Sequence, residues 1–176
     1  MPWYRDDVLF PTHAAVAYLL YRPLPFDRLN PPTGRTTGIL LAGALLPDII
    51  DKTLAFSLGT LPTRNILHSL FFAALVVSAG IYIAHRTDST VLVVAFLVGY
   101  LSHIAADVLD SWFIPNESLA FLFWPITGYH HMDAAELMSL LTLTPYTILQ
   151  VLLMLLGAFV WIRDGTPGVN TRRFEQ

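Results

Sequence analysis

Three segments of this chain are apolar over a length that is sufficient to cross a lipid bilayer. A transmembrane helix needs about 20 mostly apolar residues, because each residue adds about 1.5 Å across a hydrocarbon core of about 30 Å. Residues 66–84, 90–113 and 145–162 meet this requirement. Residues 38–58 are long enough but contain charged side chains, and residues 8–21 are about a third too short. The sequence therefore predicts an all-α, polytopic membrane bundle of about five helices.

The composition agrees with a membrane protein and excludes several other classes. Of the 176 residues, 55% are hydrophobic and 13% are charged, whereas a soluble domain has about 25% charged residues. With 10 Lys and Arg and a net charge of −3, the chain has no basic surface for a phosphate backbone, and we expect no nucleic-acid partner. The absence of cysteine excludes disulfides, thiolate metal sites and cysteine nucleophiles. We expect one integral membrane domain over residues 1–176, with a polar loop at 114–144 and membrane lipid around it.

The distribution of arginine predicts how the helices are oriented, because positively charged loops stay on the cytoplasmic side. The connection between residues 115 and 145 has no Lys or Arg. Five alternating spans place seven arginines together on the other side of the membrane. We therefore expect a multi-pass protein of the cell membrane with a cytoplasmic C-terminus. The seven are Arg22, Arg28, Arg35, Arg86, Arg163, Arg172 and Arg173.

Ionisable side chains interrupt the apolar segments. Such a residue at bilayer depth costs roughly 2.5–3.5 kcal/mol on insertion scales, and it indicates a functional site by default. Under the five-span interpretation the two early histidines begin inward-running segments, whereas the others end outward-running ones. All should therefore meet in one layer, about one to three turns below the outer surface. The six residues of this layer are His13, Asp48, Asp51, His68, His103 and Asp107, and Asp110 is a seventh ionisable residue in the same segment as the last two.

The spacing of these residues brings several of them onto common helix faces. His103, Asp107 and Asp110 lie at i, i+4 and i+7, and Asp48 and Asp51 lie at i and i+3. Carboxylates and imidazoles together suit Zn²⁺, Mn²⁺ or Fe²⁺. We therefore predict one or two divalent metal ions in a buried pocket near one face of the bundle.

A metal ion would also balance the charge of this layer. Three buried aspartates would add roughly 8–10 kcal/mol if they were unpaired, and Lys52 and Arg64 are the only local cations in the sequence. Pro47 removes a helix hydrogen bond directly before Asp48. A break of this kind is tolerated at membrane depth where the helix lines a polar cavity.

The motifs that carry these residues resemble those of the YdjM-like membrane-bound metal-dependent hydrolases. The resemblance covers about residues 13–125, in the order of the family's motifs. This chain has Thr63 and Leu67 where the family often has His and Thr. The resemblance implies metal-assisted hydrolysis and leaves the substrate open. The similar elements are Pro11-Thr12-His13, the segment from Gly43 to Asp51, the segment from Arg64 to Ser69, Gly99-Tyr100-Leu101-Ser102-His103 with Asp107, and Trp124-Pro125.

Together these observations give a hypothesis for the role of each residue. The metal would lower the pKa of a bound water toward 7, with Asp51 or Asp110 as the general base. Arg64 would hold a phosphate or carboxylate and stabilise developing negative charge. A pocket that faces the outside favours a lipid or an amphiphilic ester or phosphoester as substrate. The expected metal ligands are His13, Asp48, Asp51, His68, His103 and Asp107.

Two other functions use the same residues. A transporter could relay protons or a metal ion through the layer, but its polar residues should then continue to the cytoplasmic side. The last three predicted spans are apolar there, which favours a pocket that is closed below. A non-catalytic membrane protein could instead use the cluster as a structural metal site. The sequence does not fix the oligomeric state.

Overall fold

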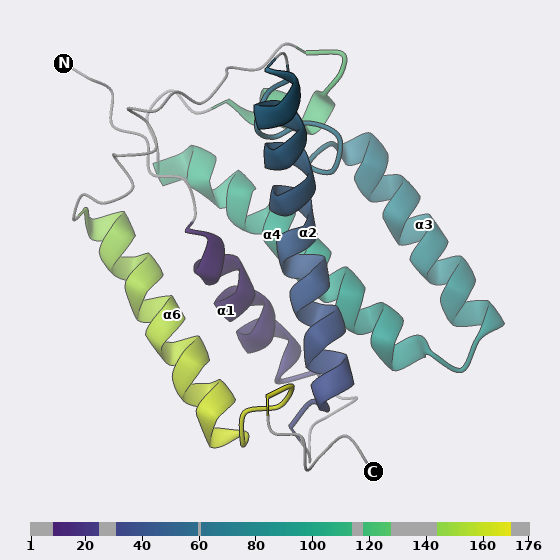
Figure 1. Cartoon of the computed structure of the whole chain (residues 1–176), viewed down its shortest axis with the longest axis vertical. Helices are drawn as coiled ribbons and strands as arrows, with labels where there is room; N and C mark the ends of the chain where they lie inside the picture. The colour runs from purple at the N-terminus through teal and green to yellow at the C-terminus, as the bar shows by residue number, and fades with distance from the viewer. Residues whose placement is uncertain (1–8, 25–30, 60, 114–117, 128–143, 170–176) are drawn as a thin grey trace.

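The structure is a computed structural model, and it describes residues 9–24, 31–59, 61–113, 118–127 and 144–169. In this part of the chain there are five α-helices and one short 3-10 helix, and no strand. The predicted all-α bundle of about five helices is therefore confirmed. The elements are α1 (Phe10–Tyr21), α2 (Gly34–Leu58), α3 (Leu70–Arg86), α4 (Thr90–Phe113), η1 (Leu119–Phe123) and α6 (Pro145–Arg163) (Figure 1).

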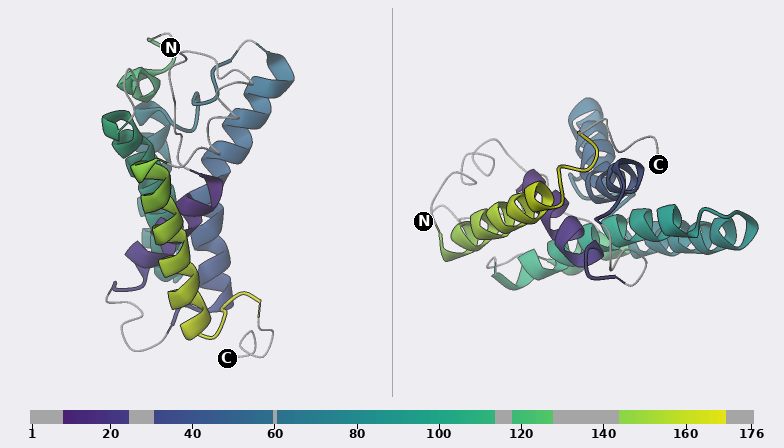
Figure 2. Two further views of the ribbon diagram at one scale, coloured as in Figure 1. Left: turned by 90° about the vertical axis from the view of Figure 1, so that its left-hand side faces the viewer. Right: turned by 90° about the horizontal axis from the view of Figure 1, so that it is seen from below.

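Successive helices run in alternate directions along the bundle (Figure 1). The starts of α1, α3 and α6 and the ends of α2 and α4 point toward one end, which we call the upper end as it is drawn. The opposite ends of the same helices form the lower end. The central helix is α1, which contacts α6 on one side and α2 and α4 on the other, while α3 packs against α4 and η1 (Figures 1 and 2).

Hydroxyl side chains fix where three helices begin, because each accepts a hydrogen bond from an otherwise unpaired backbone N–H. The Thr33 side chain accepts from Thr36 N before α2, and Thr144 caps α6 in the same way. Ser69 accepts from Phe72 N, so α3 begins at residue 70 rather than at residue 66 as the apolar pattern predicted. Residues 66–69 belong instead to the connection from α2.

Two glycines allow α2 and α4 to pack with their backbones in contact. A Cβ atom on Gly43 would lie 2.3 Å from Phe96 O, and one on Gly99 would lie 2.2 Å from Leu40 O. Small residues at crossing points are typical of helix packing in membranes, where close van der Waals contact is the main attraction. This crossing lies one turn from His103 and therefore sets where that side chain meets α2.

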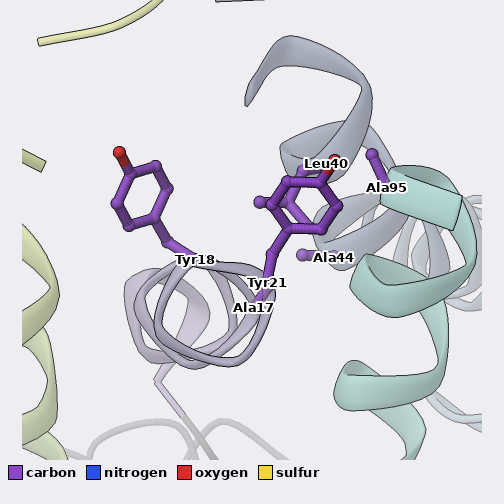
Figure 3. Close-up of a cluster of buried hydrophobic side chains, with 6 residues drawn as sticks. All are labelled: Ala17, Tyr18, Tyr21, Leu40, Ala44 and Ala95. Carbon is purple, nitrogen blue, oxygen red and sulfur yellow. The ribbon is translucent and has the colours of Figure 1, made fainter. Parts of the chain in front are cut away.

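The lower half of the bundle is filled by an apolar and aromatic cluster between α1, α2 and α4. Tyr21 lies against Leu40 and near Ala95, whereas Tyr18 leaves α1 on the other side (Figure 3). In the upper half, a second cluster joins α3, α4 and η1 around the fully buried Phe121. The polar layer described below lies between these two clusters.

The outer faces of the bundle are apolar. By length and composition, α4 and α6 are the two helices in the described residues that could cross a membrane, and α3 is apolar but shorter. Large side chains on these helices are exposed, including Leu75 and Tyr82 on α3 and Leu155, Phe159 and Ile162 on α6. Water would solvate such faces poorly, whereas lipid chains suit them.

Candidate metal centre

Five of the seven ionisable residues singled out from the sequence meet where α1, α2 and α4 converge. They come from four separate parts of the chain, and each is at most 3% exposed. One comes from α1, one from α2, two from α4, and one from the connection that precedes α3. They are His13, Asp48, His103, Asp107 and His68.

The centre of this cluster is a triangle of three donor atoms. His68 Nε2 lies 3.0 Å from His103 Nε2 and 3.2 Å from Asp107 Oδ2. His103 Nε2 lies 3.4 Å from the same Asp107 oxygen. Ligands at about 2.0–2.1 Å from a tetrahedral Zn²⁺ are about 3.3 Å from one another. The three separations therefore match the edge of a metal coordination shell.

The outer nitrogens of the two imidazoles show which atoms face the centre. His103 Nδ1 lies 2.8 Å from Ala44 O, and His68 Nδ1 lies 2.7 Å from Asp51 Oδ2. Both acceptors require a hydrogen on Nδ1, which leaves a lone pair on each Nε2. Two lone pairs at 3.0 Å repel unless a proton or a cation lies between them. Asp107 Oδ2 also has no hydrogen-bond partner among the described residues.

Two more donors lie beside this triangle. Asp48 Oδ1 is 3.6 Å from His68 Nε2 and 3.9 Å from His103 Nε2. His13 stacks its ring on that of His103 with 3.9 Å between centroids, and its Nε2 lies 3.7 Å from Asp107 Oδ1. Among the residues that the structure describes, the donor set is three imidazoles and two carboxylates, which fits Zn²⁺, Mn²⁺ or Fe²⁺. The residues present could therefore hold a metal ion.

Asp51 lies behind His68 rather than at the centre. Its carboxylate accepts hydrogen bonds from the backbone N–H groups of Asn65 and Leu67 at 3.0 and 2.9 Å, in addition to the one from His68 Nδ1. The sequence led us to expect Asp51 as a metal ligand and a general base. In the structure its carboxylate instead holds His68 and the loop that carries it. The i, i+3 spacing places Asp48 and Asp51 on one face of α2 but at different heights. One carboxylate reaches the centre, and the other fixes a ligand from behind.

The connection that carries His68 is held by a buried asparagine. Asn65 donates from Nδ2 to Pro62 O at 2.7 Å, and its Oδ1 accepts from Ile66 N at 2.6 Å. The Tyr100 hydroxyl on α4 donates to Leu67 O at 2.6 Å. These contacts fix the backbone that leads to His68.

Arg64 links the metal centre to α6, because it contacts one carboxylate of the centre and a second carboxylate that α6 also contacts. Its Nη2 donates to Asp107 Oδ1 at 3.0 Å and to Asp110 Oδ2 at 2.9 Å, and its guanidinium lies 5.3 Å from the centre of the Phe121 ring. Asp110 also accepts from the Tyr146 hydroxyl. The sequence suggested Arg64 as a phosphate holder and Asp110 as a general base. The structure instead places Arg64 between two carboxylates and Asp110 away from the triangle.

The charges of the layer leave room for a divalent cation. Arg64 is buried against Asp107 and Asp110, and Lys52 Nζ lies 2.9 Å from Asp48 Oδ2. Counting the described residues of the layer with the histidines neutral, these two cations leave two negative charges that a divalent ion would neutralise. Lys52 is 30% exposed and reaches the surface from this layer. The four buried carboxylates are Asp48, Asp51, Asp107 and Asp110.

The comparison with known families agrees with these motifs. A model of the YdjM inner membrane protein family matches residues 8–169, which include every residue of the centre. The chain belongs to the YdjM inner membrane protein family. No curated protein and no solved structure matches it. The YdjM resemblance drawn from the sequence is thus confirmed, and the chain is a membrane protein.

In this YdjM protein, several residues support the centre without having been singled out from the sequence. Asn65 and Tyr100 lie inside the motif segments but carry no charge to draw attention to them. Tyr146 and Gln150 lie on α6, outside those segments, and Gln150 Oε1 accepts from Leu9 N at 2.6 Å at the start of α1. A buried Gln in an apolar helix is itself a signal, because an amide without a partner costs free energy in that environment.

Proposed function

We propose that this protein is a membrane-embedded, metal-dependent hydrolase that acts on a lipid or an amphiphilic ester or phosphoester. The observation that carries the proposal is the approach of His68 Nε2, His103 Nε2 and Asp107 Oδ2 to within 3.4 Å of one another in a buried layer. A buried charged cluster is a poor way to stabilise a fold, since apolar residues of similar volume often do so better. Its presence therefore favours chemistry over structure.

His68, His103 and Asp107 would hold the metal ion, with Asp48 and His13 beside them. A divalent ion held there would supply Lewis-acid chemistry, polarising an ester or phosphoester and lowering the pKa of a water molecule. Both groups of residues that could hold an ion contain His103, whose Nδ1 faces Ala44 O. His103 thus has one nitrogen for coordination, and this favours a single ion.

Asp48 is the best placed residue to accept a proton. Its Oδ1 lies 3.6 Å from His68 Nε2, slightly outside the triangle, and its Oδ2 lies 2.9 Å from Lys52 Nζ. A general base must lie within reach of the reacting water and be able to release its proton afterwards. Lys52 is partly exposed and gives Asp48 a connection to the surface. Asp51 and Asp110, the bases expected from the sequence, are occupied by other donors.

Two residues position the ligands. Asp51 fixes the ring of His68 through Nδ1, and Arg64 fixes the carboxylate of Asp107 through Oδ1. In each case the contact leaves the other atom of the ligand, His68 Nε2 or Asp107 Oδ2, directed at the centre. Partners of this kind increase the basicity and the order of metal ligands.

The apolar cluster below the centre supports a hydrolase over a transporter. Between α1, α2 and α4, the space toward the lower end is filled by Tyr21, Leu40 and three alanines, all buried. Within the described residues this cluster offers no charged group that could relay a proton or an ion. The polar layer therefore ends where the cluster begins.

The arginines support the orientation that we propose, with the C-terminus in the cytoplasm and the metal centre near the outer face. Arg22, Arg35, Arg86 and Arg163 lie at the lower ends of four helices. Lys52 and Arg64 lie in the upper half with the centre. A cytoplasmic lower end satisfies the positive-inside rule.

The test is to measure the metal content of the purified protein and its turnover of a panel of lipid esters and phosphoesters. We expect Asp107→Asn to lose both the metal and turnover, and Asp88→Asn, at an exposed site by the lower end, to keep both. Metal without turnover would indicate a structural site. Metal or proton flux in liposomes would indicate a transporter. Either result would overturn the hydrolase.

A further inference from the structure

A second feature of the bundle is an apolar groove of about 330 Å³ between α1, α2 and α6. It follows the side of α1 that faces α6, whereas His13 points from α1 into the metal centre. The groove extends from Pro11 near the start of α1 to Tyr18 and Trp161 near the lower end. Its volume is within the range of ligand-binding pockets.

The shape of the groove follows from small residues on two facing helices. Ala14 and Ala15 on α1 and Gly157 and Ala158 on α6 all line it. A Cβ atom on Gly157 would lie 2.7 Å from Ala15 Cβ, so the helices touch at this point and leave a narrow space beside it. A narrow apolar space along a helix in a membrane protein suits one hydrocarbon chain.

A buried hydroxyl at the lower end of the groove lacks a partner. Thr37 lines the groove and is 2% exposed, and its Oγ1 has no hydrogen-bond partner in the part of the chain that the structure describes. A buried polar group without a partner destabilises the protein, because it has lost its hydrogen bonds to water. An acceptor on a bound molecule, such as an ester carbonyl, would satisfy this hydroxyl.

The charge around this end is positive. Arg35 in the first turn of α2 and Arg163 in the last turn of α6 are both exposed. Arg22 lies at the end of α1 and contacts Asp164 at 2.8 Å. Basic residues at a membrane surface attract anionic lipid head groups.

We propose that the groove binds one acyl chain of an anionic membrane phospholipid. The ester carbonyl accepts from Thr37, the head group lies by the arginines of the lower end, and the chain runs along α1 toward Pro11. The head group then lies at the opposite end of α1 from the metal centre. The site is therefore separate from the proposed hydrolytic reaction and does not depend on it.

The test measures the quenching of Trp161 by brominated lipids. The full chain, with Trp3, Trp112 and Trp124 replaced by Phe, is reconstituted in phosphatidylcholine vesicles with a minor fraction of phosphatidylglycerol brominated near the ester. We expect stronger quenching than with phosphatidylcholine brominated at the same position and fraction. Thr37→Val should weaken the apparent affinity roughly two- to tenfold, as expected for one hydrogen bond.

A filling variant separates the groove from the bulk membrane. Ala158 lines the groove and is exposed, so Ala158→Phe should fold and remove the excess quenching. The matched control is Ala74→Phe on the exposed face of α3, which should change nothing. Equal quenching by the two lipids, or stronger quenching by bromines at the methyl end of the chain, would overturn the proposal.

Discussion

The helices α4 and α6 are alike by length and composition, since both could cross a membrane, but they have different positions in the bundle. α4 contacts α1, α2 and α3, and it supplies His103 and Asp107 to the centre. α6 contacts α1 and exposes most of its large apolar side chains, such as Leu155 and Phe159. Apolarity thus shows that both helices could cross a membrane but does not show which one carries the proposed chemistry.

The difference arises from side chains that are small or polar. Gly99 lets α4 approach the backbone of α2, and His103, one turn later, then reaches Ala44 O. On α6, the corresponding small residue, Gly157, brings the helix against α1 only. The polar Gln150 and Tyr146 on α6 bond to the start of α1 and to Asp110. α6 therefore supports the centre through contacts with α1 and Asp110 and supplies no donor atom itself.

The largest effect should come from removing a metal donor on α4. His103→Ala deletes one corner of the triangle, and we expect the purified protein to lose most of its bound metal, measured by elemental analysis. Gln150→Ala on α6 should keep the metal and cost about 1 kcal/mol of stability through the lost hydrogen bonds. His85→Ala, at an exposed site near the lower end, is the control for a lost histidine. Equal metal loss in the α6 variant would remove the distinction between the two helices.

Asp51→Asn should have the next largest effect on metal binding. The substitution keeps the size of the side chain but weakens the hydrogen bond that orients His68. Losing such a partner typically weakens metal affinity by about 10- to 100-fold, which a competitive chelator titration would measure. Complete loss of metal would instead show that Asp51 is a direct ligand, as the sequence suggested.

Gly99 on α4 and Gly157 on α6 test the part of the comparison that concerns helix packing. Gly99→Ala places a Cβ 2.2 Å from a backbone oxygen of α2, which cannot move aside without shifting the helix. We expect a loss of about 1–3 kcal/mol in stability together with weaker metal binding. Gly157→Ala meets Ala15 Cβ at 2.7 Å and Ala15 Cα at 3.0 Å, so it should also cost stability by shifting α6 from α1. It should leave the metal in place, because α6 supplies none of the donor atoms of the centre. Thermal unfolding in detergent with metal analysis would measure both effects.

The smallest effect should come from the lower contact between α1 and α6. Tyr18 donates a hydrogen bond to Asp164 at 2.8 Å, and Tyr18→Phe removes only the hydroxyl. Hydrogen bonds between membrane helices contribute about 0.6 kcal/mol on average, so the melting temperature should fall slightly and the metal content should not change. A clear loss of metal would show that the lower contact also positions His13.

Much of the fold could be predicted from the sequence, because length and apolarity are properties of each segment by itself. Residues 90–113 form a helix with the expected bounds, and α6 begins at residue 145 as expected. The start of α3 was misplaced, because residues 66 and 67 are apolar but Ser69 caps the helix later. Apolarity does not distinguish a buried loop from the first turn of a helix.

The candidate site was predicted as a group of residues but not in its arrangement. The cost of burying charge indicated that His13, His68 and the residues of α4 should meet in one layer, and they do. The sequence could not show that Arg64 would pair with Asp107, since the two are far apart in the chain. Nor could it show that the carboxylate of Asp51 would be occupied by backbone N–H groups of a loop.

The sequence by itself determined that this chain is a membrane protein of several helices with histidines and aspartates at one depth, because both conclusions depend on the solvation of each residue. Only the tertiary structure decided which donor atoms face one another. The glycine crossing of α2 and α4 and the loop that carries His68 fix those directions. Such contacts depend on where helices cross, which no single segment encodes.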